Sequence, residues 1–213
     1  MQLNSTLTRR TYIVTEIEYQ KHYYPGSRSE LVQKLKDSLN KQSRFEHCLR
    51  VEQTAIQLAK LNHEDVEKAA VAGLIHDYAK ERSAEEFKRV IIAKKMDPDL
   101  LNWGNFIWHG EVGAEIIQDE LKITDEEILN AVRRHTIGAV QMTTLDKIVY
   151  VADYVEPERD FPGANYAREV AFADLDDGVR YETQHTLQYL LENNQKIYPA
   201  AILTYNQWNA ENR

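Results

Sequence analysis

The chain has 213 residues, of which 43% are hydrophobic, and a formal net charge of −8. The length and the hydrophobic fraction fit one domain with a sizeable core. The negative net charge argues against a general binder of nucleic acid or of anionic membranes. No apolar run approaches the roughly 20 residues that cross a bilayer. Cys48 is the only cysteine, so a disulfide within the chain and a thiolate zinc site are excluded, and we expect a cytoplasmic protein.

Residues 1–27 differ from the rest of the chain. They are aromatic and polar without a helical period, and Pro25 and Gly26 form a turn signal that closes the segment. We expect an N-terminal extension here, as a short strand or an ordered tail of unknown role. A single domain over residues 28–213 follows it.

From Ser29 onward, apolar residues recur every three or four positions, which is the pattern of amphipathic helices. The first predicted helix carries Leu31, Leu35 and Leu39. The later ones cover residues 44–60, 64–78, 84–95, 109–120, 124–135, 145–154 and 174–191. Thr124 and Glu127 match a capping box at the start of their helix. No stretch alternates long enough for a convincing sheet, so the predicted fold is all-α.

Three of these helices place histidine or aspartate inside an apolar run. His47 lies in the helix predicted for residues 44–60. The dipeptide His76-Asp77 lies in the helix predicted for 64–78, and Asp153 in the one predicted for 145–154. A buried hydrogen bond between His76 and Asp77 would explain the dipeptide alone. A divalent metal explains all four together, because it satisfies the imidazoles and neutralises carboxylates whose burial is otherwise costly.

The types of ligand restrict the metal. Two imidazoles and two carboxylates without a thiolate suit Fe²⁺, Mn²⁺, Co²⁺ or Ni²⁺. Four protein ligands on an octahedral ion leave positions for water or substrate, whereas a structural zinc site is closed. The sequence therefore predicts a hydrolytic site with His47, His76, Asp77 and Asp153 as metal ligands.

The motifs around these residues resemble those of one family. They read RFEH at 44–47, GLIHDYAK at 73–80, WHG at 108–110, RHT at 134–136 and ADYVEPERDFPG at 152–163. The order of histidine and aspartate ligands is that of the HD-domain superfamily. The full set is similar to the bacterial HD-type symmetrical bis(5′-nucleosyl)-tetraphosphatases, over residues 28–205. The resemblance implies an orthogonal helical bundle around a metal site.

The resemblance also implies an activity, the metal-dependent cleavage of diadenosine tetraphosphate and related dinucleoside tetraphosphates into two nucleoside diphosphates. The substrate-binding residues that it implies are Arg44, Asp77, Lys80, His109, Arg134, His135, Thr136 and Arg159. The catalytic residues would be Asp77, His109 and His135. The cofactor would be one divalent transition metal, iron before manganese, cobalt or nickel, and a second ion is the less favoured alternative. The partner is a small dinucleotide, and a homodimer is left open.

Each of these assignments has a simpler alternative. A basic residue is usually a solvated surface charge, and a histidine near a helix end can have a structural role, since imidazolium is favoured at a helix C-terminus. Trp103, Phe106 and Trp108 suit packing under a loop better than stacking on adenine. At the level of function, the alternatives are an HD phosphohydrolase for another nucleotide and a nucleotide-sensing module without turnover.

Overall fold

The computed structural model describes residues 17–210, and every regular element in this range is a helix, which confirms the predicted all-α fold. The helices are α1 (Arg28–Ser38), α2 (Gln42–Leu61), α3 (Val66–Ile75), α4 (Ala84–Ala93), the 3-10 helix η1 (Pro98–Asn102), α5 (Asn105–Glu111), α6 (Gly113–Leu121), α7 (Glu126–Arg134), α8 (Thr144–Val155), α9 (Ala164–Ala173), α10 (Leu175–Glu192) and α11 (Pro199–Trp208). Within these residues, no helix combines the length and the apolar character of a membrane-spanning segment.

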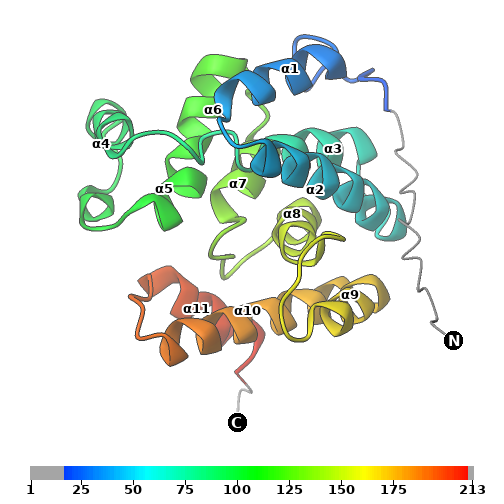
Figure 1. Ribbon diagram of the computed structural model, residues 1–213, viewed down its shortest axis with the longest axis vertical. Helices are drawn as coiled ribbons and strands as arrows, with labels where there is room; N and C mark the ends of the chain where they lie inside the picture. The colour runs from blue at the N-terminus through cyan, green and yellow to red at the C-terminus, as the bar shows by residue number, and fades with distance from the viewer. Residues whose placement is uncertain (1–16, 211–213) are drawn as a thin grey trace, which may run out of the picture.

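Helix α8 lies between two layers of helices (Figure 1). It contacts α2, α3 and α7 in one layer and α9 and α10 in the other. Its buried residues therefore cover most of its circumference, as expected for a helix that other helices surround. They are Leu145, Asp146, Ile148, Val149, Tyr150, Val151, Ala152 and Val155. This central helix carries Asp153.

Helices α2 and α3 pack closely at Gly73. A Cβ atom at this position would lie 3.0 Å from Cβ of Ala55 and 3.2 Å from Cα of Glu52. A larger residue would therefore push the two helices apart. The close packing brings the end of α3 against α2, so that the rings of His47 and His76 lie 5.3 Å apart between centroids.

Helix α3 ends earlier than the helix predicted for residues 64–78. It stops at Ile75, and residues 76–81 form turns. The N–H group of Tyr78 donates to the carbonyl oxygen of Ile75 at 2.8 Å, a three-residue hydrogen bond that tightens the chain. His76 and Asp77 therefore lie in the turn just beyond the helix, which sets the directions of both side chains.

The single helix predicted for residues 109–120 is wrong, because α5 and α6 are separate helices with a bend between them. At Gly110, an added Cβ would lie 3.0 Å from the carbonyl oxygen of Arg133. The glycine thus allows the backbone of α5 to touch that of α7. As a result, the rings of His109 and His135 lie 4.9 Å apart between centroids.

The cap predicted for α7 is wrong by one position. Asp125, and not Thr124, precedes the helix, and its carboxylate accepts hydrogen bonds from the N–H groups of Glu127 and Ile128. A carboxylate at the cap position satisfies the first free N–H groups of a helix, so the Thr124–Glu127 capping box does not form.

Helices α9 and α11 were not predicted from the sequence. Helix α9 begins after Gly163, and α11 has Pro199 in its first turn. Both pack against α10. Their inner faces give a weak hydrophobic signal, since the buried residues of α9 are all alanines (Ala164, Ala167 and Ala171).

The described part of the N-terminal segment, residues 17–27, packs against α3. The carboxylate of Glu67 accepts the backbone N–H of Lys21 at 2.9 Å, and Tyr24 is only 4% exposed. Of the two expected forms, a short strand or an ordered tail, residues 17–27 contain no strand and pack as an ordered segment, and residues 1–16 lie outside the described residues. The division of the chain after residue 27 stays a prediction.

Candidate metal centre

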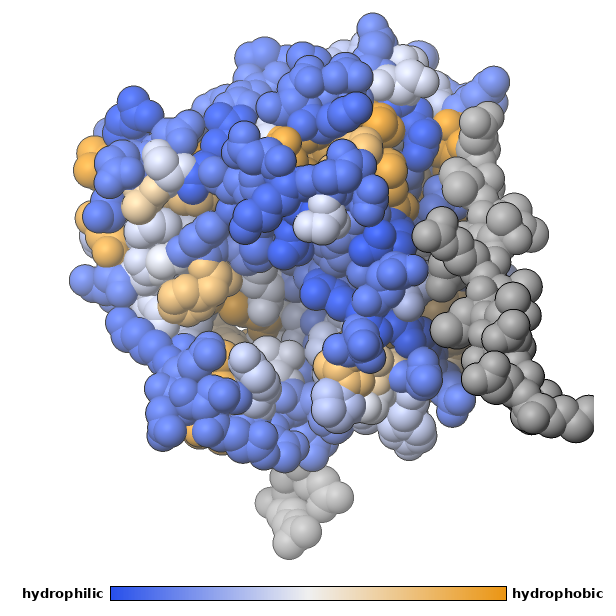
Figure 2. Space-filling model, in the orientation of Figure 1, coloured by the Kyte–Doolittle hydropathy of each residue, from blue (hydrophilic) through white to orange (hydrophobic). Residues whose placement is uncertain are grey.

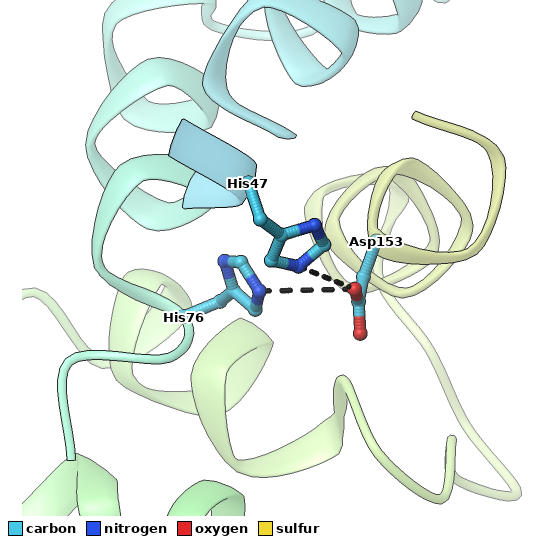
Figure 3. A group of neighbouring side chains, drawn as sticks. All are labelled: His47, His76 and Asp153. Atoms are coloured by element: carbon cyan, nitrogen blue, oxygen red, sulfur yellow. Dashed lines mark ion pairs between the residues drawn. The ribbon is translucent and has the colours of Figure 1, made fainter. Parts of the chain in front are cut away.

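Three helical elements bring His47, His76 and Asp153 to one point inside the fold (Figure 3). His47 belongs to α2, His76 follows the last residue of α3, and Asp153 belongs to α8. Nε2 of His47 lies 3.0 Å, and Nε2 of His76 lies 3.8 Å, from Oδ1 of Asp153. Both histidines are buried, so the three side chains form a compact polar group in an apolar core.

The carboxylate of Asp77 lies between two pairs of histidines. Its Oδ2 is 3.5 Å from Nε2 of His76 and 4.0 Å from Nε2 of His47. Its Oδ1 is 3.5 Å from Nε2 of His109 and 3.7 Å from Nε2 of His135. The structure thus gathers all four candidate ligands and both additional histidines into one cluster. We call these six residues the histidine–aspartate cluster.

Hydrogen bonds at Nδ1 determine the tautomers of three imidazoles. Nδ1 of His76 and Nδ1 of His135 each lie 2.7 Å from the carbonyl oxygen three residues earlier. Nδ1 of His109 contacts the carbonyl oxygen four residues earlier. A carbonyl oxygen only accepts, so Nδ1 carries the hydrogen and Nε2 of the neutral ring keeps a free lone pair. Metal-binding histidines are oriented in this way.

Several polar atoms of the cluster are buried without a hydrogen-bond partner among the described residues. They are Nε2 of His47, Nε2 of His76, Nε2 of His135 and Oδ1 of Asp77. Each such atom costs about 1–3 kcal/mol when it stays unsatisfied. An ion with bonds of about 2.1 Å spaces its ligand atoms about 3–4 Å apart. The separations of 3.0–4.0 Å between the Nε2 atoms of His47 and His76 and the carboxylate oxygens of Asp77 and Asp153 therefore fit a divalent transition metal.

Neighbouring charges and hydrogen bonds favour the ionised form of both aspartates of the cluster. Burial alone would raise the pKa of Asp77, but His76 and other nearby groups outweigh it and hold that pKa well below its usual value. Burial of Asp153 is likewise outweighed by Arg159, which keeps the pKa of this carboxyl well below its usual value. Carboxylates bind metals in this ionised form.

Glu156 orients His47, and the sequence-based site had not included it. Its Oε1 accepts a hydrogen bond from Nδ1 of His47 at 3.1 Å, and its Oε2 accepts one from Nε of Arg50 at 2.6 Å. Burial would raise the pKa of Glu156, but these hydrogen bonds lower it to about 2. The glutamate is therefore a permanent acceptor that turns Nε2 of His47 toward the cluster. Its place in the 152–163 motif was the available sequence signal.

Two arginines lie at the edge of the cluster and pair with its carboxylates. Nη1 of Arg44 donates to Oδ2 of Asp77 at 2.7 Å. Nε of Arg159 donates to the carbonyl oxygen of Asp153 at 2.8 Å, and its guanidinium also pairs with the carboxylate of Asp153. Both arginines are about one-third exposed, at 30% and 35%. Their guanidinium groups thus connect the cluster to solvent.

Lys80 is the third basic residue at this edge. Its ammonium group donates to Nε2 of His109 at 2.8 Å and lies 3.6 Å from Oδ1 of Asp77. Burial, together with this ammonium group, lowers the pKa of His109 to about 3. His109 is therefore neutral at physiological pH, and its ring accepts the hydrogen bond from Lys80.

Arg134 and Thr136 differ from the other candidate substrate-binding residues. The guanidinium of Arg134 pairs with Asp146, in the first turn of α8, and with no residue of the cluster within residues 17–210. The hydroxyl of Thr136 is buried and has no hydrogen-bond partner in the described part of the chain. The structure thus places Thr136 beside the cluster, next to His135, and directs Arg134 toward α8.

The three aromatic residues Trp103, Phe106 and Trp108 differ in how far they are buried. Trp108 is 4% exposed, and its indole N–H donates to the carbonyl oxygen of Leu100 at 2.7 Å. Trp103 contacts Tyr198 edge-on, with ring centroids 4.8 Å apart. Phe106 is 51% exposed. Trp108 therefore packs in the core, whereas the ring of Phe106 is open to solvent.

Comparisons with known proteins show which family the sequence matches. The profile of the HD domain family matches residues 44–158. A symmetrical bis(5′-nucleosyl)-tetraphosphatase of Bacillus subtilis is 41% identical over 84% of this chain and 96% of its own length. One from Halalkalibacterium halodurans is 40% identical over 85% of this chain and 96% of its own.

A solved structure has the same fold. It is the crystal structure of a protein from Clostridium acetobutylicum described as an HD superfamily hydrolase involved in NAD metabolism. The two chains are 30% identical and superpose with a TM-score of 0.79, over 84% of this chain and 95% of the other. The helical arrangement around the cluster is therefore that of a known HD structure.

Proposed function

Because the chain belongs to the HD-domain family and, within it, to the symmetrical bis(5′-nucleosyl)-tetraphosphatases, we propose that it hydrolyses diadenosine tetraphosphate to two ADP. Related dinucleoside tetraphosphates are cleaved in the same way. The observation that carries the proposal is the set of unsatisfied Nε2 and Oδ1 atoms in the histidine–aspartate cluster. Nε2 of His47 and Nε2 of His76 lie 3.0–4.0 Å from carboxylate oxygens of Asp77 and Asp153, which is the spacing of metal ligands, and basic residues surround the cluster.

We assign the metal ligands as His47, His76, Asp77 and Asp153. Their mixed nitrogen and oxygen donors suit Fe²⁺ first, with Mn²⁺, Co²⁺ or Ni²⁺ as substitutes. When bound, a divalent ion supplies Lewis-acid chemistry that polarises a phosphoryl oxygen and acidifies water. The ligand atoms of this set are the Nε2 atoms of the two histidines and carboxylate oxygens of the two aspartates, and these carboxylates also pair with Arg44 and Arg159.

We favour one ion over two for this site. A second ion would bind beside Oδ1 of Asp77, with His109 and His135. The ammonium group of Lys80 already lies 3.6 Å from that oxygen and donates to Nε2 of His109. The ammonium group of Lys80 thus already supplies positive charge beside this oxygen, which lowers the need for a second ion.

The basic residues hold the phosphate chain. Arg44, Lys80 and Arg159 lie at the exposed edge of the cluster, where each can donate to phosphate oxygens. Arginine suits this task because its planar guanidinium matches two phosphate oxygens at once. Together they stabilise the negative charge that develops on the leaving ADP.

Proton transfer falls to Asp77 and His135 in this proposal. Both have a buried acceptor atom without a hydrogen-bond partner among the described residues, Oδ1 and Nε2 respectively. These atoms can receive the proton of the attacking water. His109, with its pKa lowered to about 3, stays neutral and positions the ammonium group of Lys80 instead of acting as the general acid.

Separation of the reaction products tests the function. The purified chain is loaded with Fe²⁺ or Mn²⁺ and incubated with diadenosine tetraphosphate. The proposal predicts ADP as the only nucleotide product. Equal amounts of ATP and AMP would contradict the symmetrical cut. Faster hydrolysis of a deoxynucleoside monophosphate would favour another nucleotide as substrate, and binding without hydrolysis would favour a sensing module. A homodimer and a cytoplasmic location stay predictions.

A further inference from the structure

An apolar cleft lies beside the histidine–aspartate cluster. It has a volume of about 180 Å³ and separates α5 and the end of α7 from α10 and α11. Its walls include Phe106, Ile107, Thr136, Tyr150, Leu187 and Tyr198. Figure 2 shows a hollow bordered by apolar side chains at this position.

The cleft and the cluster share three structural elements. Ile107 lies two residues before His109 on α5, and Tyr150 lies one turn before Asp153 on α8. Thr136 directly follows His135, whose Nε2 is 3.7 Å from Oδ1 of Asp77. A ligand that places its phosphates at the cluster can therefore extend its remaining part into the cleft.

The walls of the cleft select a flat and largely apolar group. No carboxylate is among the residues that line it. Phe106 is 51% exposed although the ring of Trp103 lies edge-on to it, with ring centroids 6.1 Å apart, so part of the Phe106 ring is open to a ligand. The polar residues of the lining include Thr183, Thr186 and Lys196. Aromatic and apolar walls with a few polar groups are typical of nucleobase recognition.

The size of the cleft restricts its occupant further. Sites for whole drug-sized ligands have volumes of roughly 300–1,000 Å³. At about 180 Å³, this cleft holds one ring system and not a complete dinucleotide. We infer that it binds one nucleobase of the dinucleoside tetraphosphate, with Phe106 as the stacking residue. The inference rests on the proposed function, since it takes the phosphate chain to lie at the cluster.

The test compares ADP with inorganic pyrophosphate, which lacks the nucleoside. Binding of ADP and of inorganic pyrophosphate to the Mn²⁺-loaded chain is measured by calorimetry. Phe106→Ala should weaken ADP binding about tenfold, the loss expected for one base–aromatic stack. Pyrophosphate binding should change less than about twofold, as for an exposed substitution. Phe106→Tyr keeps the ring and should retain ADP affinity.

Phe172→Ala provides the matched control. Phe172 is 37% exposed on α9 and lines a different hollow, so its removal should leave ADP binding unchanged. Equal weakening of ADP and pyrophosphate by Phe106→Ala, or unchanged ADP binding, would overturn the inference. So would equal effects of Phe106→Ala and Phe172→Ala.

The same measurements separate this inference from the proposed function. ADP binding requires no turnover. If the wild-type chain fails to cleave diadenosine tetraphosphate while Phe106→Ala still weakens ADP binding selectively, the cleft assignment stands and the function falls. If the wild-type chain releases two ADP while Phe106→Ala binds ADP normally, the function stands and the cleft assignment falls.

Discussion

The histidine–aspartate cluster and the basic residues at its edge differ in how their polar atoms are satisfied. Inside the cluster, Nε2 of three histidines and Oδ1 of Asp77 are buried without a hydrogen-bond partner in the described part of the chain. At the edge, by contrast, Arg44 and Arg159 each already pair with a carboxylate. Side chains of the described chain therefore satisfy the basic groups at the edge of the cluster, whereas the buried polar atoms inside the cluster still lack a partner.

This difference indicates that the metal binds before the arginines can bind phosphate. The carboxylates that hold Arg44 and Arg159 belong to Asp77 and Asp153, which are the assigned metal ligands. A bound cation neutralises the same carboxylates, so the arginines become available for phosphate. We therefore expect loss of the metal to weaken phosphate binding as well as hydrolysis.

The largest effect is expected from Asp77→Asn. The substitution removes a charged ligand from the centre of the cluster, and loss of several kcal/mol of transition-state stabilisation lowers kcat/KM by about a thousandfold. Metal content per chain, measured on the same sample, should fall as well. Asp119→Asn, on a side chain that is 57% exposed, is the control. Full turnover by Asp77→Asn would contradict the assignment of Asp77 as a metal ligand.

Glu156→Gln should have the next largest effect. Loss of the carboxylate that orients His47 should weaken metal affinity about 10–100-fold. Turnover should recover at saturating metal, because Glu156 contacts no substrate in this account. Titration of activity with Mn²⁺ measures both quantities.

Glu158→Gln serves as the control for Glu156→Gln, since Glu158 is exposed two residues away. A turnover that stays low at every metal concentration would indicate damage to the fold and contradict the positioning role of Glu156.

Arg44→Gln should raise KM for diadenosine tetraphosphate about tenfold, because a hydrogen bond to a charged group contributes about 1.5–3 kcal/mol. The effect on kcat should be smaller. Lys60→Gln, an exposed change on the same helix, should leave KM unchanged. An unaltered KM for Arg44→Gln would mean that the edge does not bind phosphate.

Arg134→Gln should have the smallest effect on hydrolysis, with KM changing less than about twofold. Its partner Asp146 is completely buried, so the free energy of unfolding should fall by about 3 kcal/mol. Urea denaturation measures this loss, and Arg133→Gln, whose partners are partly exposed, should lose less. A tenfold rise in KM would instead place Arg134 among the phosphate-binding residues.

The sequence predicted the fold class and the residues that the structure gathers, because both depend on local patterns. Apolar runs around His76 and Asp153 indicated buried helices, and the family motifs indicated the order of the ligands. The contact between His47 and Glu156 joins residues 109 positions apart. No periodicity reports such a pairing, so the role of Glu156 required the structure.

The elements that were missed have equally physical causes. Helices α5 and α6 meet at Val112, which keeps nearly helical backbone angles (φ −91°, ψ −27°), so the division between them left little signal in the sequence. Arg134 shared a motif with His135, but only the packing of α7 on α8 reveals that its guanidinium meets Asp146.

The central claim is that one divalent ion in the cluster enables symmetrical hydrolysis. The most direct measurement is a titration of the metal-stripped chain with Fe²⁺ under anaerobic conditions, in which ADP release from diadenosine tetraphosphate is followed. We predict no hydrolysis without metal and a linear rise in rate that ends at one ion per chain. Equal rates before and after addition of the metal would contradict the metal-dependent site, and a break at two ions would contradict the single-ion assignment.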